Sequence, residues 1–315
     1  MEEAPDAAQL ITDAAASFVT PALAPAVREA LAPVFAGSEP EERRALLHRL
    51  LTTGDGWGYF PPCPLARRVN LALGHLTVLP SSRLMGAEQL SALQEREVVY
   101  LANHLSFSDA NLFAYLLERD GHDRIGDRLC VLAGPKVFTD PFRRFSSLCF
   151  GAIKLPQSPT RASGEAVMPR REVARVAAVT IAASMERLAQ GDHLMIFVEG
   201  ARSRTAAMQP ALGAVSRYLE RPDTLLVPLG IVGSELLVPI GEEHGHPTQV
   251  TIHVGAPIEA ARLWRATEHK RGLLMHAVGA AIAQLLPPAY QGYYAATNPD
   301  DELARARAAL RAASV

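Results

Sequence analysis

Short apolar runs alternate with helix-like stretches along most of the chain after residue 76. Six runs are rich in Val, Ile and Leu, and several are apolar at every position, which is typical of strands covered on both faces. They are residues 98–103 (VVYLAN), 129–134 (LCVLAG), 151–155 (GAIKL), 194–198 (LMIFV), 225–232 (LLVPLGIV) and 250–254 (VTIHV). Helical spacing separates them at about residues 110–119, 170–190, 210–220 and 268–286. The alternation predicts an α/β fold, with a mostly parallel or mixed central sheet flanked by helices.

The first 68 residues show helical spacing without strand-like runs. Residues 38–41 (SEPE) predict a capping box at the start of a helix that carries Leu46, Leu47, Leu50 and Leu51. A stretch rich in glycine and proline, residues 54–64, then interrupts any helix. We therefore predict a small N-terminal helical region over residues 1–68 and an α/β domain over residues 69–315.

Composition narrows the class of protein. Hydrophobic residues make up 49% of the chain and charged residues 20%, which excludes a disordered or fibrous protein. The net charge of −2 gives no overall electrostatic attraction to nucleic acid, so no nucleic-acid partner is predicted. Three cysteines at unrelated spacings, a start without the pattern of a signal peptide and the lack of a long apolar run predict a cytoplasmic protein, soluble or attached to a membrane surface.

The first candidate site follows the run at 98–103. In the segment NHLSFSD, residues 103–109, His104 and Asp109 are five positions apart, which is wrong for one face of a helix. At a turn from strand to helix, Asp109 can accept a hydrogen bond from one ring nitrogen of His104 and leave the other nitrogen as a base. The alternative is that Asp109 caps a helix and His104 is a structural turn residue.

The second candidate site follows the run at 194–198. The segment FVEGARSRT, residues 197–205, places Arg202 and Arg204 among small residues, and guanidinium groups match a phosphate with two parallel hydrogen bonds. Gly200 permits close approach of the backbone to a ligand. The alternative is a solvated turn in which Glu199 pairs with Arg202.

Together, and in this order, the two segments resemble the His-x4-Asp and Glu-Gly-x-Arg-Ser blocks of the glycerolipid acyltransferase family. Residues 83–90 (RLMGAEQL), 132–155 and 225–231 (LLVPLGI) add supporting matches, and the resemblance extends from about residue 83 to 294. The stretch AGPKVFTDPFRRFSS, residues 133–147, and the helical N-terminal region are similar to the soluble plastid-type glycerol-3-phosphate acyltransferases.

The resemblance implies transfer of a fatty acyl chain from an acyl thioester to a hydroxyl of glycerol 3-phosphate or lysophosphatidate. The thioester, acyl-CoA or acyl-carrier protein, is a co-substrate, and no further cofactor is implied. His104 is implied as general base with Asp109 as its partner. Substrate-binding roles are implied for Glu199, Gly200, Arg202 and Arg204.

The sequence departs from the family pattern at two places. The second block of the family usually ends its strand with an Asp-Arg pair, whereas GAIK here continues into LPQ, residues 155–157. We expect Lys154 or Arg161 to replace the missing arginine. Val198 stands before Glu199, where a proline is common.

Other interpretations remain open at this stage. One keeps the chemistry but changes the acceptor to a lysophospholipid, an amine lipid or a hydroxylated metabolite. Another is a non-catalytic lipid-binding relative, against which the presence of an oriented base argues.

The histidines at 244, 246 and 253 lack a complete ligand set, so no metal is predicted. The arginines at 170, 171, 175 and 187 are interpreted as a solvated helix face, or as a contact with anionic lipid or acyl carrier protein. The apolar N-terminal residues Leu10, Ile11, Phe18, Val34 and Phe35 are either core or a surface for peripheral membrane contact.

Overall fold

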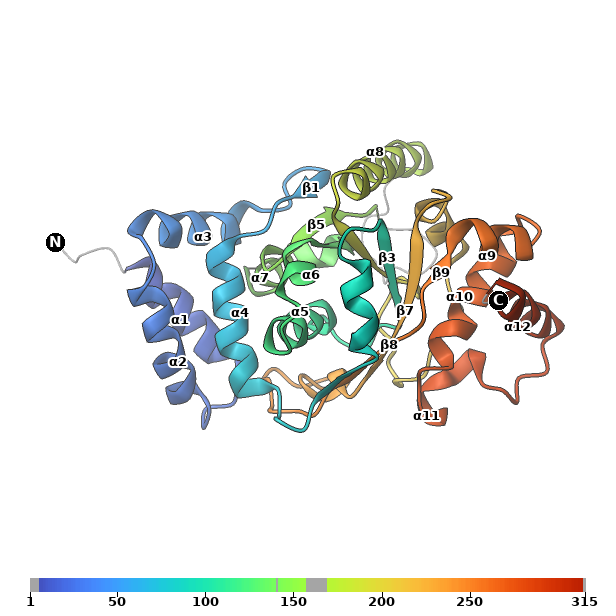
Figure 1. Cartoon of the computed structure of the whole chain (residues 1–315). Helices are drawn as coiled ribbons and strands as arrows, with labels where there is room; N and C mark the ends of the chain where they lie inside the picture. The colour runs from blue at the N-terminus through green and yellow to red at the C-terminus, as the bar shows by residue number, and fades with distance from the viewer. Residues whose placement is uncertain (1–5, 140, 157–168, 314–315) are drawn as a thin grey trace.

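Nine strands form one mixed sheet in the computed structural model, which describes residues 6–139, 141–156 and 169–313 (Figure 1). The strands are β1 (Gly58–Phe60), β2 (Arg83–Met85), β3 (Val98–Ala102), β4 (Leu129–Ala133), β5 (Gly151–Lys154), β6 (His193–Phe197), β7 (Leu225–Val232), β8 (Thr251–Val254) and β9 (Ile258–Glu259). Their order is β1-β5-β4-β6-β3-β7-β8-β2, and β9 pairs with β7. The five strands from β5 to β7 in this order are mutually parallel, so their carboxyl ends share one edge of the sheet. The predicted α/β fold class is confirmed.

Helices cover both faces of the sheet. They are α1 (Ala7–Phe18), α2 (Ala24–Ala36), α3 (Pro40–Thr52), α4 (Pro64–Thr77), α5 (Asp109–Arg119), α6 (Asp123–Asp127), α7 (Pro141–Leu148), α8 (Arg170–Ala189), α9 (Ala260–Ala266), α10 (Arg271–Ala283), α11 (Pro288–Gln291) and α12 (Asp301–Ala313). The first four lie at one end of the molecule and α9 to α12 at the other (Figure 1). Among the described residues, no helix is long and apolar enough to cross a membrane.

Strand β3 shows why the central runs are apolar at every position. Val98, Tyr100 and Ala102 belong to the core cluster shared with α1 to α5, whereas Val99 and Leu101 belong to the cluster shared with α8, α10 and α12. All five side chains are at most 1% exposed. Successive side chains of a strand point to opposite faces, so a strand between two helical layers needs apolar residues at every position.

The N-terminal helices pack onto the sheet domain rather than standing apart from it. Val27 and Leu31 of α2 and Leu46 of α3 are fully buried in the same cluster as the strand residues. Of the five apolar residues considered for membrane contact, Ile11 and Phe35 are buried, Phe18 and Val34 are partly buried, and Leu10 is 40% exposed. The boundary predicted at residue 68 falls inside α4.

Several elements differ from the sequence-based expectation. The helix predicted over 210–220 is a 3-10 helix over Gly213–Tyr218, because Pro210 and Gly213 interrupt its start. The N-cap of α3 is Glu39 rather than Ser38, and the capping box joins Glu39 to Glu42. Helix α12 was not predicted because alanine supplies most of its buried face.

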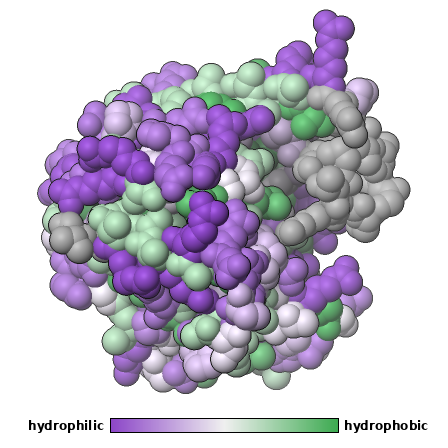
Figure 2. Space-filling model, turned by 90° about the vertical axis from the view of Figure 1, so that its right-hand side faces the viewer, coloured by the Kyte–Doolittle hydropathy of each residue, from purple (hydrophilic) through white to green (hydrophobic). Residues whose placement is uncertain are grey.

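Hydrophilic and weakly apolar residues mix on the surface that α9, α10 and α12 form (Figure 2).

A buried histidine makes the stability of the fold depend on pH. His193 of β6 is 0% exposed, and its Nδ1 lies 3.4 Å from the Tyr100 hydroxyl. Burial, and then the nearby Arg128, lower the pKa of His193 from 6.5 to about 4. Between these two values the unfolded chain binds a proton that the folded chain does not, so stability falls as the pH drops through this window.

We expect His193→Gln to weaken the dependence of the free energy of unfolding on pH. Urea unfolding at pH 7 and pH 4 should show that the wild-type chain loses about 2 to 3 kcal/mol more than the variant on acidification. His246→Gln, at a partly exposed histidine paired with Glu242, is the matched control and should follow the wild type. An equal pH dependence in His193→Gln and wild type would contradict the assignment.

Candidate active site

Three strand ends meet where the first candidate segment leaves the sheet. Strand β3 lies between β6 and β7, and Ala102 at its end is in register with Phe197 of β6 and Leu229 of β7. The segment with His104 therefore emerges beside the segment with Glu199. Asn103 fastens it to β7, because its side-chain amide donates to the Ile231 carbonyl at 2.9 Å and accepts from the Ile231 N–H at 2.8 Å.

The carboxylate of Asp109 is the centre of a buried hydrogen-bond network. Its Oδ2 accepts from the Leu105 N–H and lies 2.8 Å from His104 Nδ1, while both oxygens lie 3.0 Å from the Ser106 nitrogen. The Ser234 hydroxyl, from the loop after β7, donates to Oδ1 at 2.6 Å. Asp109 is 0% exposed, so these donors replace the water that an ionised carboxylate would otherwise need.

His104 is held on three sides. Nδ1 faces Asp109, the ring stacks on Phe197 with centroids 4.1 Å apart, and the backbone N–H donates to Glu199 Oε1 at 3.0 Å. Among the described residues, none hydrogen-bonds Nε2, and 16% of the side chain is exposed. With Nδ1 donating to Asp109, the lone pair of Nε2 is available to accept a proton.

Glu199 joins two loops. It is 0% exposed, and while Oε1 accepts from His104, Oε2 accepts from the Gln209 N–H at 2.7 Å. Burial raises the pKa of Glu199, and these two N–H donors oppose the rise. Glu199 therefore positions the backbone of both loops, and its expected contact with substrate stays a prediction.

Gly200 is required by the backbone. Its φ is 69°, and a Cβ there would lie 2.2 Å from Leu212 Cδ1. The positive φ makes a side chain unfavourable at this position independently of any ligand, and the Leu212 side chain would have to shift to admit one.

The cations are divided between two places. The Arg202 guanidinium lies 3.8 Å from the centroid of Phe107, next to the histidine loop, and Arg204 is exposed nearby. Lys154 is instead bonded to the Gly54 carbonyl and lies over the Trp57 ring at 4.7 Å, so the structure does not bring it to the arginines. Arg161, the other expected substitute, lies outside the described residues.

Comparison with known proteins gives a match over the part of the chain that holds both candidate segments. A family model described as Acyltransferase matches residues 82–232, which include both candidate segments. Just under half of the chain is therefore similar to an acyltransferase domain. It is also similar to the solved 1-acyl-sn-glycerophosphate (LPA) acyltransferase PlsC from Thermotoga maritima, with 15% identity, a TM-score of 0.48 and coverage of 89% of this chain and 93% of that chain. No curated protein matches the chain.

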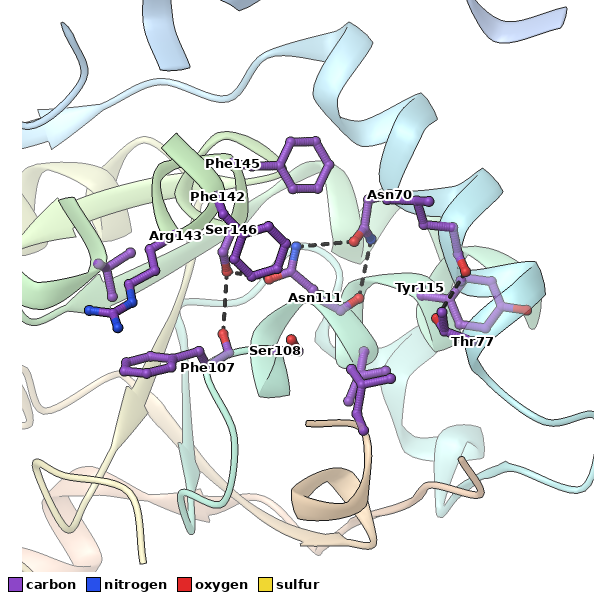
Figure 3. Close-up of a pocket in the computed structure, with 15 residues that line it drawn as sticks. Asn70, Thr77, Phe107, Ser108, Asn111, Tyr115, Phe142, Arg143, Phe145 and Ser146 are labelled. Atoms are coloured by element: carbon purple, nitrogen blue, oxygen red, sulfur yellow. Dashed lines mark hydrogen bonds between the residues drawn. The ribbon is translucent and has the colours of Figure 1, made fainter. Parts of the chain in front are cut away.

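A pocket opens beside the histidine loop, between α4, α5 and α7 (Figure 3). Three of its polar side chains bond to one another: Asn111 donates to Asn70 at 3.0 Å, and Ser146 bonds to Asn111. The remaining lining is largely apolar and comprises Leu73, Gly74, Leu112, Tyr115, Val137, Phe142, Phe145 and Leu237. The pocket therefore suits an apolar ligand.

Two residues that lie near the histidine loop were not found from the sequence. Ser234 lies 125 positions after Asp109, in a loop without a motif, and Arg143 lies in a stretch quoted only as a supporting match. The guanidinium of Arg143 lies 4.8 Å from the centroid of Phe107, the ring that also carries Arg202. No motif or local spacing in the sequence predicts the contact of Ser234 with Asp109 or that of Arg143 with Phe107.

Among the described residues, no group of three or more His, Cys, Asp or Glu is arranged to hold a metal.

We expect Ser234→Ala to reduce kcat about tenfold with little change in the KM of either substrate. Loss of a hydrogen bond to a charged group costs about 1.5 to 3 kcal/mol, and here it loosens the carboxylate that orients His104. Ser234→Thr should restore most of kcat. The matched control is Ser216→Ala, at a buried serine whose hydroxyl bonds to the Gly213 carbonyl. Equal kcat in Ser234→Ala and wild type would contradict this role.

Proposed function

We propose that the enzyme transfers a fatty acyl chain from an acyl thioester to a hydroxyl of glycerol 3-phosphate or lysophosphatidate, with His104 as general base. The observation that carries this proposal is the short contact between His104 Nδ1 and the buried Asp109 carboxylate, which directs the Nε2 lone pair away from Asp109. An ordinary alcohol needs such a base to attack a carbonyl at neutral pH.

The reaction needs no covalent acyl-enzyme. His104 Nε2 takes the proton of the acceptor hydroxyl as its oxygen attacks the thioester carbonyl carbon. The ester C–O bond forms, the C–S bond of the tetrahedral intermediate breaks, and the proton passes from His104 to the departing thiolate. Asp109 stabilises the imidazolium between the two proton transfers.

Arg202 and Arg204 support a phosphorylated acceptor. Arg202 is half-buried on Phe107, where the site excludes part of the surrounding water, and electrostatic attraction to a phosphate is stronger there than at an open surface. A phosphate bound to these guanidinium groups would orient the glycerol hydroxyl toward His104. This orientation lowers the activation free energy of acyl transfer, because the reacting groups are already in position.

The pocket between α4 and α5 supports a fatty acyl donor. We place the acyl chain in this pocket, with its thioester at the end near Phe107 and Ser108 and its methyl end toward Tyr115. Gly74 makes room for the Tyr115 ring, because a Cβ there would lie 2.2 Å from Tyr115 Cδ2. Both acyl-CoA and acyl-carrier protein remain candidate donors, and a cytoplasmic enzyme that contacts the membrane peripherally would meet either.

We expect His104→Ala to reduce kcat at least about 100-fold, the lower end of the effect of a general base. Mass spectrometry of the products measures both the loss of activity and the class of acceptor. The donors are acyl-CoA and acyl-carrier protein, and the acceptors are glycerol 3-phosphate, lysophosphatidate, lysophosphatidylcholine and glycerol. His48→Ala, at an exposed histidine of α3, is the control. Near wild-type turnover in folded His104→Ala would refute the base. Equal use of unphosphorylated glycerol would refute the acceptor.

We expect Leu73→Phe to shift the enzyme toward shorter acyl donors, because the larger ring fills part of the pocket. Each methylene excluded costs about 0.8 kcal/mol, so losing room for two lowers the ratio of kcat/KM for long over short chains about 15-fold. Leu71→Phe, on the same helix but outside the pocket lining, is the matched control. An unchanged chain-length profile in Leu73→Phe would place the acyl chain elsewhere.

A further inference from the structure

Arg143 has no part in the chemistry described so far, yet it lies at the end of the pocket nearest the catalytic loop. It belongs to α7, and it lines the pocket together with Phe107 and Ser108 (Figure 3). Its Nη1 is 3.4 Å from the Thr139 hydroxyl, which helps to fix the side chain.

Phe107 brings Arg143 and Arg202 together from segments about sixty residues apart. The Cζ atoms of the two arginines lie 4.8 Å and 3.8 Å from the centroid of this one ring, and Phe107 is itself the third residue after His104. The ring face attracts each cation, while the cations repel each other. Burial, and then Arg143, lower the pKa of Arg202, and Arg204 acts in the same direction.

Arg143 and Arg202 thus share the ring of Phe107, three residues after His104, and Arg204 acts electrostatically on Arg202. A phosphomonoester that carries two negative charges offers three oxygens that can accept hydrogen bonds from guanidinium groups. A phosphodiester carries one negative charge and has two of its oxygens esterified.

We propose that Arg143 is a specificity-determining residue, which completes with Arg202 and Arg204 a site for the phosphomonoester of the acceptor. This rests on the proposed function and deepens it. Arg143 thereby supplies, from helix α7, the cation that was expected from Lys154 or Arg161. It favours acceptors with a terminal phosphate over those with a phosphodiester headgroup.

Binding of inorganic phosphate to the protein without substrates tests the site directly. Isothermal titration calorimetry should show at least about tenfold weaker binding in Arg143→Ala, since hydrogen bonds to charged groups contribute about 1.5 to 3 kcal/mol. Arg143→Lys, which keeps the charge but loses the planar fork, should lie between the two. The matched control is Arg262→Ala, at an exposed arginine that pairs with Glu259 on the opposite side of the sheet domain. Phosphate binding by Arg143→Ala equal to wild type would overturn the proposal.

Kinetics then separates the acceptor from the donor, whose CoA moiety also carries phosphates. With an acyl-N-acetylcysteamine thioester, which carries no phosphate, Arg143→Ala should still raise the KM for the phosphorylated acceptor about tenfold and reduce the preference for lysophosphatidate over lysophosphatidylcholine. A defect confined to acyl-CoA would assign Arg143 to the donor and overturn the proposal. If wild type acylates no phosphorylated acceptor while phosphate binding depends on Arg143, the proposed function fails and the anion site stands.

Discussion

The buried carboxylate of Asp109 is the interaction on which the site depends. A charge at 0% exposure is costly to keep unless hydrogen bonds replace its hydration, and here the donors come from the loop after β3 and from Ser234 after β7. The N–H groups of Leu105 and Ser106 bend the loop after β3 around the carboxylate, and Ser234 joins it to the loop after β7. The orientation of His104 follows from this network rather than from the histidine itself.

A second buried carboxylate performs the same task on the other side of β3. Glu199 accepts from the backbone of His104 and of Gln209, so it joins the histidine loop to the turn after β6. Both acidic groups use their oxygens on backbone donors within the protein. The ring of His104 is therefore held in place before any substrate binds, as the proposed role of general base requires.

The surroundings of His104 separate two kinds of ligand. Guanidinium groups gather at Phe107, whereas the pocket beyond it is lined by leucine, phenylalanine and tyrosine side chains. This division matches the two proposed substrates, an anionic acceptor at the guanidinium groups and a fatty acyl donor in the pocket. The N-terminal helices take part in it, because α4 forms one wall of the pocket and packs on α2.

The sequence alone determined the α/β fold, the central strands and the pairing of His104 with Asp109. Strands buried on both faces are apolar throughout, and a contact within one strand-to-helix turn depends on few residues. Only the tertiary structure decided the rest. It showed that Glu199 connects two loops, that Lys154 lies at Gly54 and Trp57, and that Ser234 and Arg143 lie near the histidine loop. Those contacts join segments far apart in the chain, where strand order and helix packing, not local spacing, decide which side chains meet.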